Sequence, residues 1–523
     1  MKTSRILLSL LALATIVGCS EGNDENQVVN PNEGDVSYLA VKLKAAGDLS
    51  RAEDTDFEDG SDDENAVESA VFFFFDADGK PANVIEPSPG LKVNYYSTPL
   101  TFTTESSDAN IEEVAAPVVV INGYKEAVPT QMFTILNYTY ADESLTLDEV
   151  RDLTSVIQNT SGKFVMATSV YAEGDEDIVT SAISGVYVAN SASSAKASPV
   201  VVHVERLASK VTLTVAEPDG FDLAAKAAGK AVKVKVLNWG LVSTQDKTNI
   251  VKKIDPAWTE DALGFAWNDP THYRSYWATS VQNWGADFNK FKLDEMTSLP
   301  AGFEYCGENT GAEAENRTKV VVIAQLQDKS TSDPVAPVEL AKWLGVQYAG
   351  ETALLEAVAG TLASTIFSGV DNGGGGKTYT SISKDDIKCV ATAGYTVTFA
   401  PSNPGAAKTW YSKSGANYTE VNIADELAKI APAQVYNDGM TYYTVDVRHL
   451  ATKDPGKAGE FGVVRNHSYQ INITGIEGFG TPIYNMEQEI VSPEDPADHE
   501  SYIASEVKIL AWRLVSQDAV LGQ

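Results

Sequence analysis

The sequence predicts an all-β protein made of β-sandwich domains with small helical insertions. Short apolar runs, many of them alternating with polar residues, recur along the chain between turns rich in glycine, proline and aspartate. This is the pattern of many short strands, and helical patterns are few beside it. A composition of 43% hydrophobic and 21% charged residues is that of a folded protein. A length of 523 residues allows two or three domains.

The N-terminus reads as an export signal. Lys2 and Arg5 precede an apolar run, Ile6 to Val17, of 12 residues. A membrane span needs about 20, so the run is typical of a removable signal peptide. Gly18-Cys19 ends it in the manner of a bacterial lipoprotein signal, in which the cysteine thiol takes a lipid and becomes the new N-terminus. The alternative is an ordinary secretory signal with a chance cysteine.

The next segment combines a strand with an accessible arginine. Residues 20–35 are polar and indicate a tether. From Ser37 to Lys44 apolar and other residues alternate, which predicts a half-buried strand. Arg51 follows, and then an acidic run from Glu53 to Glu64. Like charges in such density repel and have no core to bury, so we expect this run to be mobile and exposed.

The body of the chain continues with strands. Val67 to Phe75, ending in four phenylalanines, predicts a strand buried on both faces. Thr146 and Glu149 form a capping-box pattern and predict one helix. The predicted organisation is a signal at 1–19, a tether and first strand at 20–51, an N-terminal sandwich at 52–216, a C-terminal sandwich at 217–480 with a helical insertion at 333–371, a linker at 481–505 and a terminal strand at 506–523.

Charge and motifs exclude several functions. A formal net charge of -33 makes nucleic acid a poor partner, because phosphate binding needs clustered lysine and arginine. The five histidines show no zinc spacing, Gly373 to Thr378 lacks the spacing of a phosphate loop, and Asp76-x-Asp78-Gly79 reads as a hairpin turn. We therefore predict no catalytic residues, no metal and no cofactor. The aromatic residues from Trp258 to Phe288 fit either sandwich packing or stacking on sugars, which leaves a glycan-binding surface lipoprotein as the alternative function.

Two cysteines remain once Cys19 carries lipid. Cys306 and Cys389 can form a disulfide in an oxidising compartment, which would constrain the unfolded chain by on the order of 4 kcal/mol. Without geometry the pairing stays open.

The two ends of the chain point to assembly. Apolar residues occupy both faces of the terminal strand: Val507, Ile509, Leu510, Trp512 and Leu514. Such a strand is an aggregation hazard unless it fills a groove. Removal of the first strand by cleavage after Arg51 would open one, into which the strand of another copy could be added through main-chain hydrogen bonds.

The order of several motifs resembles that of a known family. They are the lipoprotein signal, Arg51 after the first strand, Glu205 to Val211, Tyr305 to Thr310, Val464 to Tyr469 and Ile509 to Val515. In these the chain resembles the type V pilins, the fimbrillins of anaerobic Gram-negative Bacteroidales, and is nearest to the branch that forms minor-fimbria shafts.

The resemblance implies a structural role without catalysis. It implies two tandem transthyretin-like β-sandwich domains, lipidation at Cys19, and cleavage of the Arg51-Ala52 bond by an arginine-specific surface protease. Val507 to Val515 would then be the donor strand of a homopolymer in an adhesive cell-surface fimbrium. The implied partners are other copies of the chain, anchor and tip subunits, the protease, and the outer membrane through the lipid before processing.

Overall fold

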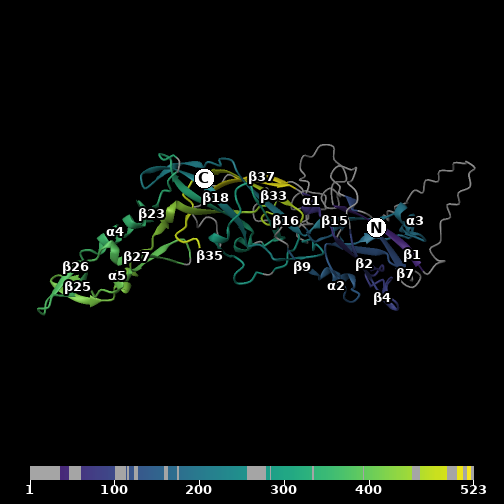
Figure 1. The fold of residues 1–523 in the computed structure, drawn as a ribbon, viewed down its shortest axis with the longest axis horizontal. Helices are drawn as coiled ribbons and strands as arrows, with labels where there is room; N and C mark the ends of the chain where they lie inside the picture. The colour runs from purple at the N-terminus through teal and green to yellow at the C-terminus, as the bar shows by residue number, and fades with distance from the viewer. Residues whose placement is uncertain are drawn as a thin grey trace, which may run out of the picture.

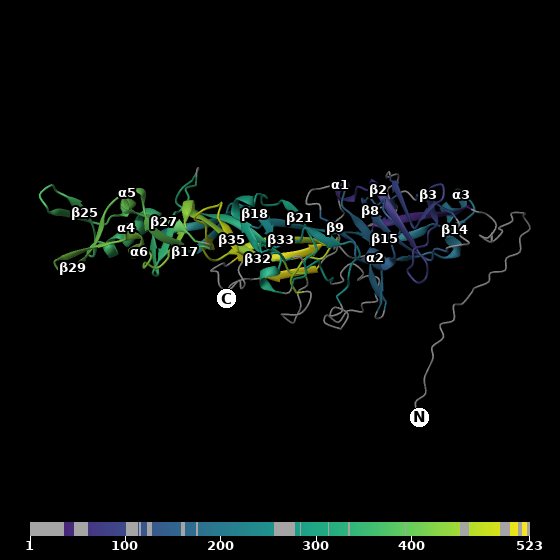
Figure 2. The same cartoon turned by 90° about the horizontal axis from the view of Figure 1, so that it is seen from below.

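The computed structural model describes residues 36–45, 61–100, 113–114, 117–122, 128–157, 163–173, 176–255, 278–282, 284–311, 313–332, 335–392, 394–449, 460–491, 503–510 and 515–519. These residues form an elongated molecule (Figures 1 and 2). The N-terminal part lies at one end, the C-terminal part in the middle and an insertion at the other end. Strands predominate throughout, so the all-β prediction is confirmed.

The N-terminal part is built on one large sheet. Its order is β14-β1-β15-β10-β8-β2-β5, with β6 and β7 paired to β1 and β13 paired to β8. The strands are β1 Val36–Ala45, β2 Ser69–Phe75, β5 Tyr95–Pro99, β6 Glu113–Val114, β7 Val118–Asn122, β8 Gln131–Leu136, β10 Met166–Thr168, β13 Ser181–Ala182, β14 Val188–Ala189 and β15 Val200–Arg206. Smaller elements are β3 Ile85–Ser88, β4 Leu91–Val93, β9 Thr154–Val156, β11 Tyr171–Glu173, β12 Glu176–Ile178, and the helices α1 Asp62–Asn65, α2 Leu147–Arg151 and α3 Ala192–Ala197.

Strand β2 is buried on both faces, as predicted. Phe72 and Phe74 belong to one hydrophobic cluster, the N-terminal core, with residues of β1, β7 and β15. Phe73 and Phe75 point to the opposite cluster, which includes Ile250 and other residues from later in the chain. The side chains of a strand alternate between faces, so an unbroken apolar run is what a strand with two covered faces requires.

The C-terminal part consists of two facing five-stranded sheets. Their orders are β21-β16-β33-β36-β37 and β17-β18-β22-β32-β34. The first contains β16 Ala208–Val215, β21 Phe303–Gly307, β33 Ser468–Ile476, β36 Ile503–Leu510 and β37 Val515–Ala519; the second contains β17 Phe221–Ala227, β18 Lys230–Val242, β22 Lys319–Asp328, β32 Met440–Asp446 and β34 Thr481–Pro482. Between them lies the C-terminal core, with Val211 and Ile471 from the first sheet and Val234 and Val322 from the second. Outside these sheets, β20 Lys290–Lys292 pairs with β35 Glu489–Val491, and β19 Lys247–Asn249 pairs with β9.

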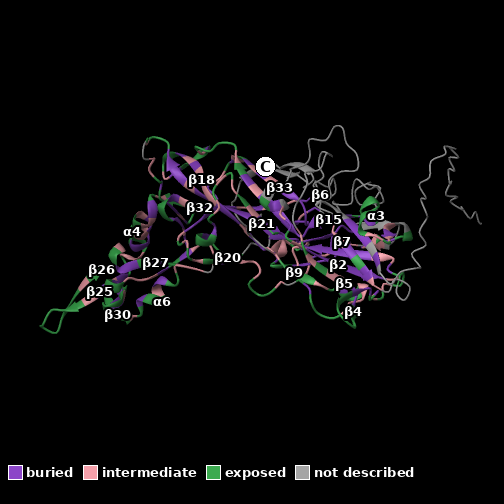
Figure 3. Ribbon diagram, turned by 45° about the vertical axis from the view of Figure 1, so that its right-hand side comes forward, coloured by how far each residue is buried: buried purple, intermediate pink, exposed green. Residues whose placement is uncertain are grey.

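The insertion is larger and less helical than predicted. Of the predicted segment 333–371, the structure describes residues 335–371, in which α4 Gly350–Leu362 is the only helix, and the unit extends to residue 436. Its other elements are β23 Leu340–Trp343, β24 Val346–Tyr348, β25 Ile366–Asp371, β26 Lys377–Ser381, β27 Ile387–Ala391, β28 Val397–Pro401, α5 Asn403–Ala406, β29 Trp410–Ser414, β30 Asn417–Val421, α6 Ile423–Leu427 and β31 Gln434–Tyr436. It has a hydrophobic cluster of its own, to which Leu354, Phe399 and Trp410 contribute. Figure 3 shows exposed hairpins at its outer end.

Two predicted boundaries are corrected. Strand β15 of the N-terminal sheet ends at Arg206 and β16 of the C-terminal sheet begins at Ala208, so the chain changes sheets before residue 216. The predicted linker 481–505 contains β34, β35 and the start of β36. The linker prediction depended on a composition rich in proline and acidic residues. The segment nevertheless forms strands, because β34, β35 and β36 pair with strands of the folded part.

Short 3-10 helices complete the described elements, at Gly185–Tyr187, Leu293–Glu295, Ala314–Asn316, Lys384–Asp386 and Asn437–Gly439. Across the described ranges, every helix is too short or too polar to cross a membrane. The division into two transthyretin-like domains stays a prediction.

Candidate assembly strands and the polar junction

Strand β1 fills a channel in the N-terminal sheet. On one side Val36 to Ala40 pair antiparallel with β7, from Asn122 to Val118, and the following residues pair with β6. On the other side Val41 to Ala45 pair in parallel with β15, from Val200 to Val204. The strand thus has hydrogen-bonded neighbours along both edges.

The channel buries the middle of β1 completely. Leu39, Ala40 and Val41 are all 0% exposed, and Ser37 is 1% exposed. Leu39 and Val41 belong to the N-terminal core, and full burial of such side chains contributes about 1.5–3 kcal/mol each. Helix α3 packs against β1 and places Ala195 in the interior. Loss of β1 would therefore leave unpaired backbone groups on β7 and β15 and an open apolar channel.

The C-terminal strands lie at the edge of the other part of the molecule. Strand β36 pairs antiparallel with β33, with Val507 opposite Ile471, Ile509 opposite Tyr469 and Leu510 opposite Ser468. Strand β37 pairs with β36 and is the last strand of that sheet. The prediction of one strand from Val507 to Val515 is therefore corrected: its start lies in β36 and its last residue in β37, and these two strands run antiparallel to each other. Trp512 and Leu514 lie outside the described residues, as do Cys19, Arg51 and Ala52.

The two remaining cysteines do not form a disulfide. Cys306 and Cys389 are both free and buried. Cys306 belongs to the C-terminal core and Cys389 to the cluster of the insertion, so they are held in separate interiors. Burial raises the pKa of the Cys306 thiol to about 12 and also raises the pKa of Cys389. The disulfide considered from the sequence is corrected accordingly.

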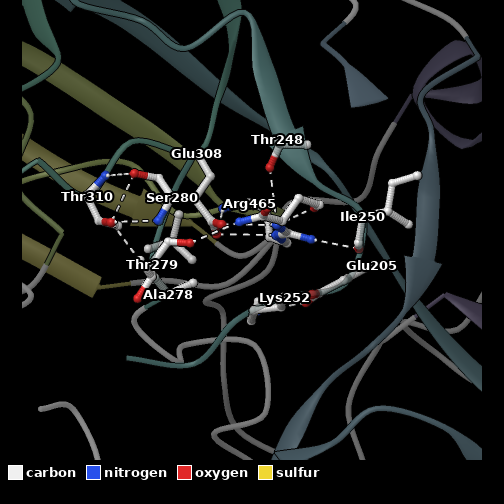
Figure 4. A network of polar contacts seen from close by, with 12 residues as sticks. Glu205, Thr248, Ile250, Lys252, Ala278, Thr279, Ser280, Glu308, Thr310 and Arg465 are labelled. Carbon is white, nitrogen blue, oxygen red and sulfur yellow. Dashed lines mark hydrogen bonds and ion pairs between the residues drawn. The ribbon is translucent and has the colours of Figure 1, made fainter. Parts of the chain in front are cut away.

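A set of buried charges, the polar junction, lies where the N-terminal and C-terminal parts meet. Its members are Glu64, Glu205, Lys210, Lys252, Tyr305, Glu308 and Arg465. The Arg465 guanidinium pairs with the Glu308 carboxylate at 3.0 Å, and both side chains are 0% exposed. The same guanidinium donates to the carbonyl oxygens of Asn249 at 2.7 Å and Ile250 at 3.1 Å (Figure 4). Ile250 packs in the cluster on the N-terminal sheet, so Arg465 ties the two parts together.

Two further carboxylates complete the polar junction. Glu205, near the end of β15, pairs with the Lys252 ammonium at 2.9 Å, and these side chains are 1% and 0% exposed. Glu64 of α1 accepts from the Tyr305 hydroxyl at 2.5 Å and pairs with Lys210 at 3.0 Å. Each buried carboxylate thus has a cationic partner, as burial of charge requires.

Glu64 contradicts the sequence-based expectation for its segment. The acidic run was expected to be exposed, but Glu64 is 1% exposed. Ser61 and Glu64 form a reciprocal capping box that begins α1. The sequence contains the pattern Ser-x-x-Glu, which predicts the start of a helix. It is hard to recognise because the neighbouring residues are also acidic.

The C-terminal sequence decides the family. Residues 434–518, from the start of β31 into β37, match the sequence model of the C-terminal region of fimbrillin, described as major fimbrial subunit protein type IV. The chain therefore carries the C-terminal region of a fimbrillin. The type V pilin prediction is thereby confirmed at the level of the family, whereas the minor-fimbria shaft branch stays a prediction.

Solved structures that are similar to this chain are distant in sequence. A candidate cell adhesion protein from Parabacteroides distasonis is 13% identical with a TM-score of 0.39, over 90% of this chain and 96% of the other. A fimbrilin (fimA) from Porphyromonas gingivalis W83 is 12% identical with a TM-score of 0.28, over 87% and 94%. The tip fimbrial protein Mfa3 from Porphyromonas gingivalis, with a C-terminal truncation, is 10% identical with a TM-score of 0.31, over 91% and 99%. TM-scores below 0.5 do not establish a common fold, so the assignment depends on the C-terminal match.

No curated protein sequence matches this chain significantly. The family consists of fimbrial subunits, which are structural proteins of the cell surface, and this confirms the prediction of a non-enzymatic protein. Of the aromatic stretch Trp258 to Phe288, the structure describes Trp284 and Phe288, both partly buried. The glycan-binding alternative stays a prediction.

The motifs behind the family resemblance meet at the polar junction. Glu205 and Lys210 come from the first motif, Tyr305 and Glu308 from the second, and Arg465 from the third. Their shared location indicates that these motifs hold the parts of the subunit together. Sequence reasoning missed Lys252, which no motif singles out.

Proposed function

We propose that this fimbrillin is a structural subunit of an adhesive cell-surface fimbrium that polymerises by donor-strand exchange. The observation that carries the proposal is β1, which is buried between β7 and β15 and lies upstream of Arg51. Cleavage after Arg51 would free β1 from the rest of the chain. The emptied channel would then accept the C-terminal strand of another copy.

The proposal includes the route to the surface. Lipidation at Cys19 tethers the exported precursor to the outer membrane, and an arginine-specific surface protease cuts the Arg51-Ala52 bond. Because lipid and β1 both lie before the cut, one cleavage releases the subunit from the membrane and opens its channel. Elongation follows from strand insertion between copies, and anchor and tip subunits join the ends of the fibre.

The proposal is tested by sequencing the N-terminus of the mature subunit and by a variant that the protease cannot cleave at position 51. N-terminal sequencing of sheared fimbriae is expected to give Ala52. Cells with Arg51→Ala are expected to retain a lipidated monomer, because β1 still fills the channel. Arg151→Ala, at the end of α2, is the matched control and is expected to form fibres of normal length. Long fibres on Arg51→Ala cells, seen by electron microscopy, would contradict the proposal.

A further inference from the structure

The outer end of the insertion is a four-stranded sheet with two open edges. Its order is β26-β25-β29-β30, so β26 Lys377–Ser381 and β30 Asn417–Val421 are the edge strands. Within the part of the chain that the structure describes, no strand pairs with the outer side of either one. Both lie at the exposed tip of the insertion (Figure 3). Each edge therefore presents backbone N–H and C=O groups to which another strand can bind.

These two edges lack the features that commonly protect an edge strand. The pairing of β26 with β25 and of β30 with β29 is continuous, and neither edge strand contains proline. Other edge strands of the chain are protected: β5 ends in Pro99, β34 contains Pro482, and the pairing of β17 is interrupted by a shift of register. Because proline and bulges prevent further pairing, β26 and β30 differ from these strands in being able to accept a partner.

The large side chains of this sheet lean away from its open edges. Tyr379 of β26 and Tyr418 of β30 stack on each other, with ring centroids 3.7 Å apart and an interplanar angle of 5°. They come from opposite edges of the sheet, so both rings point inward over β25 and β29. The residues beside them, Thr378, Thr380 and Thr419, are exposed. Short side chains thus flank the backbone at both edges and leave it accessible.

Charge favours a second copy of the chain as the partner. The four strands carry two lysines, Lys377 and Lys413, and two acidic residues, Asp371 and Glu420, so they have no net formal charge. The whole chain has a formal net charge of -33, and copies therefore repel one another over most of their surface. A neutral sheet at the end of an elongated molecule is a place where two copies can approach with little of this repulsion.

The two edges are complementary to each other in direction and in register. Neighbouring strands of the sheet are antiparallel, so the first and the last of the four run in opposite directions. When two copies present the same face, β26 of one therefore meets β30 of the other antiparallel. A register that places Lys377 opposite Glu420 also places Thr378 opposite Thr419 and one stacked tyrosine opposite the other. Opposite charges and paired threonines at facing positions stabilise antiparallel strands.

We propose that copies of this chain associate side by side through antiparallel pairing of β26 of one copy with β30 of the next, with Lys377 opposite Glu420. A pairing of five residues is small, and interfaces of this size are weak. Subunits repeated along two neighbouring fibres make many such contacts at once, and linked contacts bind far more tightly than single ones. The inference adds a lateral contact to the fimbrial role and does not depend on strand exchange.

Cysteines placed on two separate proteins test the pairing. Thr378→Cys and Thr419→Cys are prepared in chains that begin at Ser20, which retain every described element. After mild oxidation at high protein concentration, the mixture is expected to give a linked dimer on a non-reducing denaturing gel, because facing residues of paired strands lie within disulfide reach. Each protein alone is expected to give several-fold less dimer. Cys306 and Cys389 are buried and do not compete.

The register has a control on the same face of the same strands. Thr380→Cys is expected to link with Asn417→Cys, which faces it in the proposed register, and several-fold less with Thr419→Cys. The same mixtures are repeated with sheared fimbriae from two strains, each carrying one of the cysteines, because repeated contacts raise the yield.

Reversal of the charge pair tests its role. Lys377→Glu in the Thr378→Cys protein places two acidic residues opposite each other and is expected to lower the yield by up to about fivefold. Glu420→Lys in the Thr419→Cys protein alone is expected to do the same, and the two reversals together are expected to restore linkage. Lys377 also donates a hydrogen bond to the Tyr411 hydroxyl of its own chain. Restoration by Glu420→Lys therefore separates lost pairing from misfolding.

The outcomes are distinct from those for the proposed function, which concerns other strands. Linkage of 378 with 419 that both charge reversals control supports the inference. Dimers formed equally well by Thr378→Cys alone would show β26 pairing with β26, and would overturn it. Equal linkage of 380 with 419, or no linkage in the mixed fimbriae, would also overturn it.

Discussion

Arg465 and Glu308 form an ion pair of 3.0 Å from which solvent is excluded on both sides. The pair connects the loop before β33 to the residue that follows β21, and Arg465 also binds the carbonyls of Asn249 and Ile250. Removal of either partner would leave a charge in the interior without compensation.

Arg465→Met is expected to lower the free energy of unfolding by about 3–5 kcal/mol, because Glu308 then stays buried and unpaired. The double variant Arg465→Met/Glu308→Gln is expected to recover part of this loss, since it removes the uncompensated charge. Urea denaturation of the purified Arg51→Ala precursor measures both. A loss below about 1 kcal/mol in the single variant would show that the pair does not hold the junction.

The pKa of Glu64 predicts a loss of stability in acid. Burial disfavours its charged form, but hydrogen bonds from Tyr305, the Ser61 N–H and Lys210 outweigh this and lower the pKa below the ordinary value of 4.5. A lowered pKa in the folded state stabilises the fold above the unfolded pKa, and this contribution disappears as pH falls through the folded pKa. The stability advantage of wild type over Glu64→Gln is therefore expected to shrink below about pH 4.5.

Glu304 supplies the control of opposite sign for this experiment. Its pKa is raised, with burial as the largest cause. Stability relative to Glu304→Gln is then expected to increase as pH falls, because the protonated form suits the interior. Equal pH slopes for both variants, measured by urea denaturation between about pH 3 and pH 7, would contradict both assignments.

The thiols are expected to be unreactive in the folded protein. The thiolate is the reactive form, and burial raises the pKa of both Cys306 and Cys389. Processed protein is expected to give no thiol labelling at pH 8 when native and labelling of both cysteines in urea. Its melting temperature is expected not to change with reductant. Loss of urea-exposed thiols without reductant would show that a disulfide forms after all.

The insertion is expected to be removable. Leu340 lies opposite Tyr436 and belongs with it to the C-terminal core, whereas their neighbours Ala341 and Val435 belong to the separate cluster of the insertion. Replacement of residues 343–433 by Asn-Gly would join β23 to β31 as a hairpin. Circular dichroism is expected to show a folded β protein with a cooperative transition.

A matched control tests where the boundary lies. A deletion that also removes Leu340 and Tyr436 takes two side chains from the C-terminal core, and we expect it to lower the melting temperature further. If the hairpin variant unfolds as readily as this control, the insertion contributes to the core of the sandwich.

Local residue patterns were sufficient to predict β1 and β2 of the N-terminal sheet. The alternation from Ser37 to Lys44 predicted β1 to within one residue at each end, and the four phenylalanines predicted the two covered faces of β2. In both strands the residue pattern directly reflects which faces are covered. The terminal segment was predicted to be one strand, whereas β36 and β37 are two strands that pair antiparallel with each other.

Contacts between residues that are far apart in the chain could not be predicted from local sequence patterns. The residues near Glu64 in the sequence do not show that Tyr305, which is distant in the chain, contacts it. The acidic run around Glu64 therefore predicts an exposed segment. The sequence pattern indicates a helical insertion because α4 has the clearest apolar period, whereas strands such as β25 and β30 have many exposed residues and a weak alternation. Cys306 and Cys389 lie apart because one belongs to the C-terminal core and the other to the cluster of the insertion. These two clusters could not be distinguished from the sequence.

The position of the polar junction bears on how fimbrillins recognise one another. The motifs through which this chain resembles its family serve contacts inside a single chain. Under the proposed strand exchange, compatibility between chains would instead depend on the channel that β1 fills, which buries Leu39, Ala40 and Val41 completely. Two subunits could therefore share every residue of the polar junction and still fail to join in one fibre, if the side chains that line this channel differ.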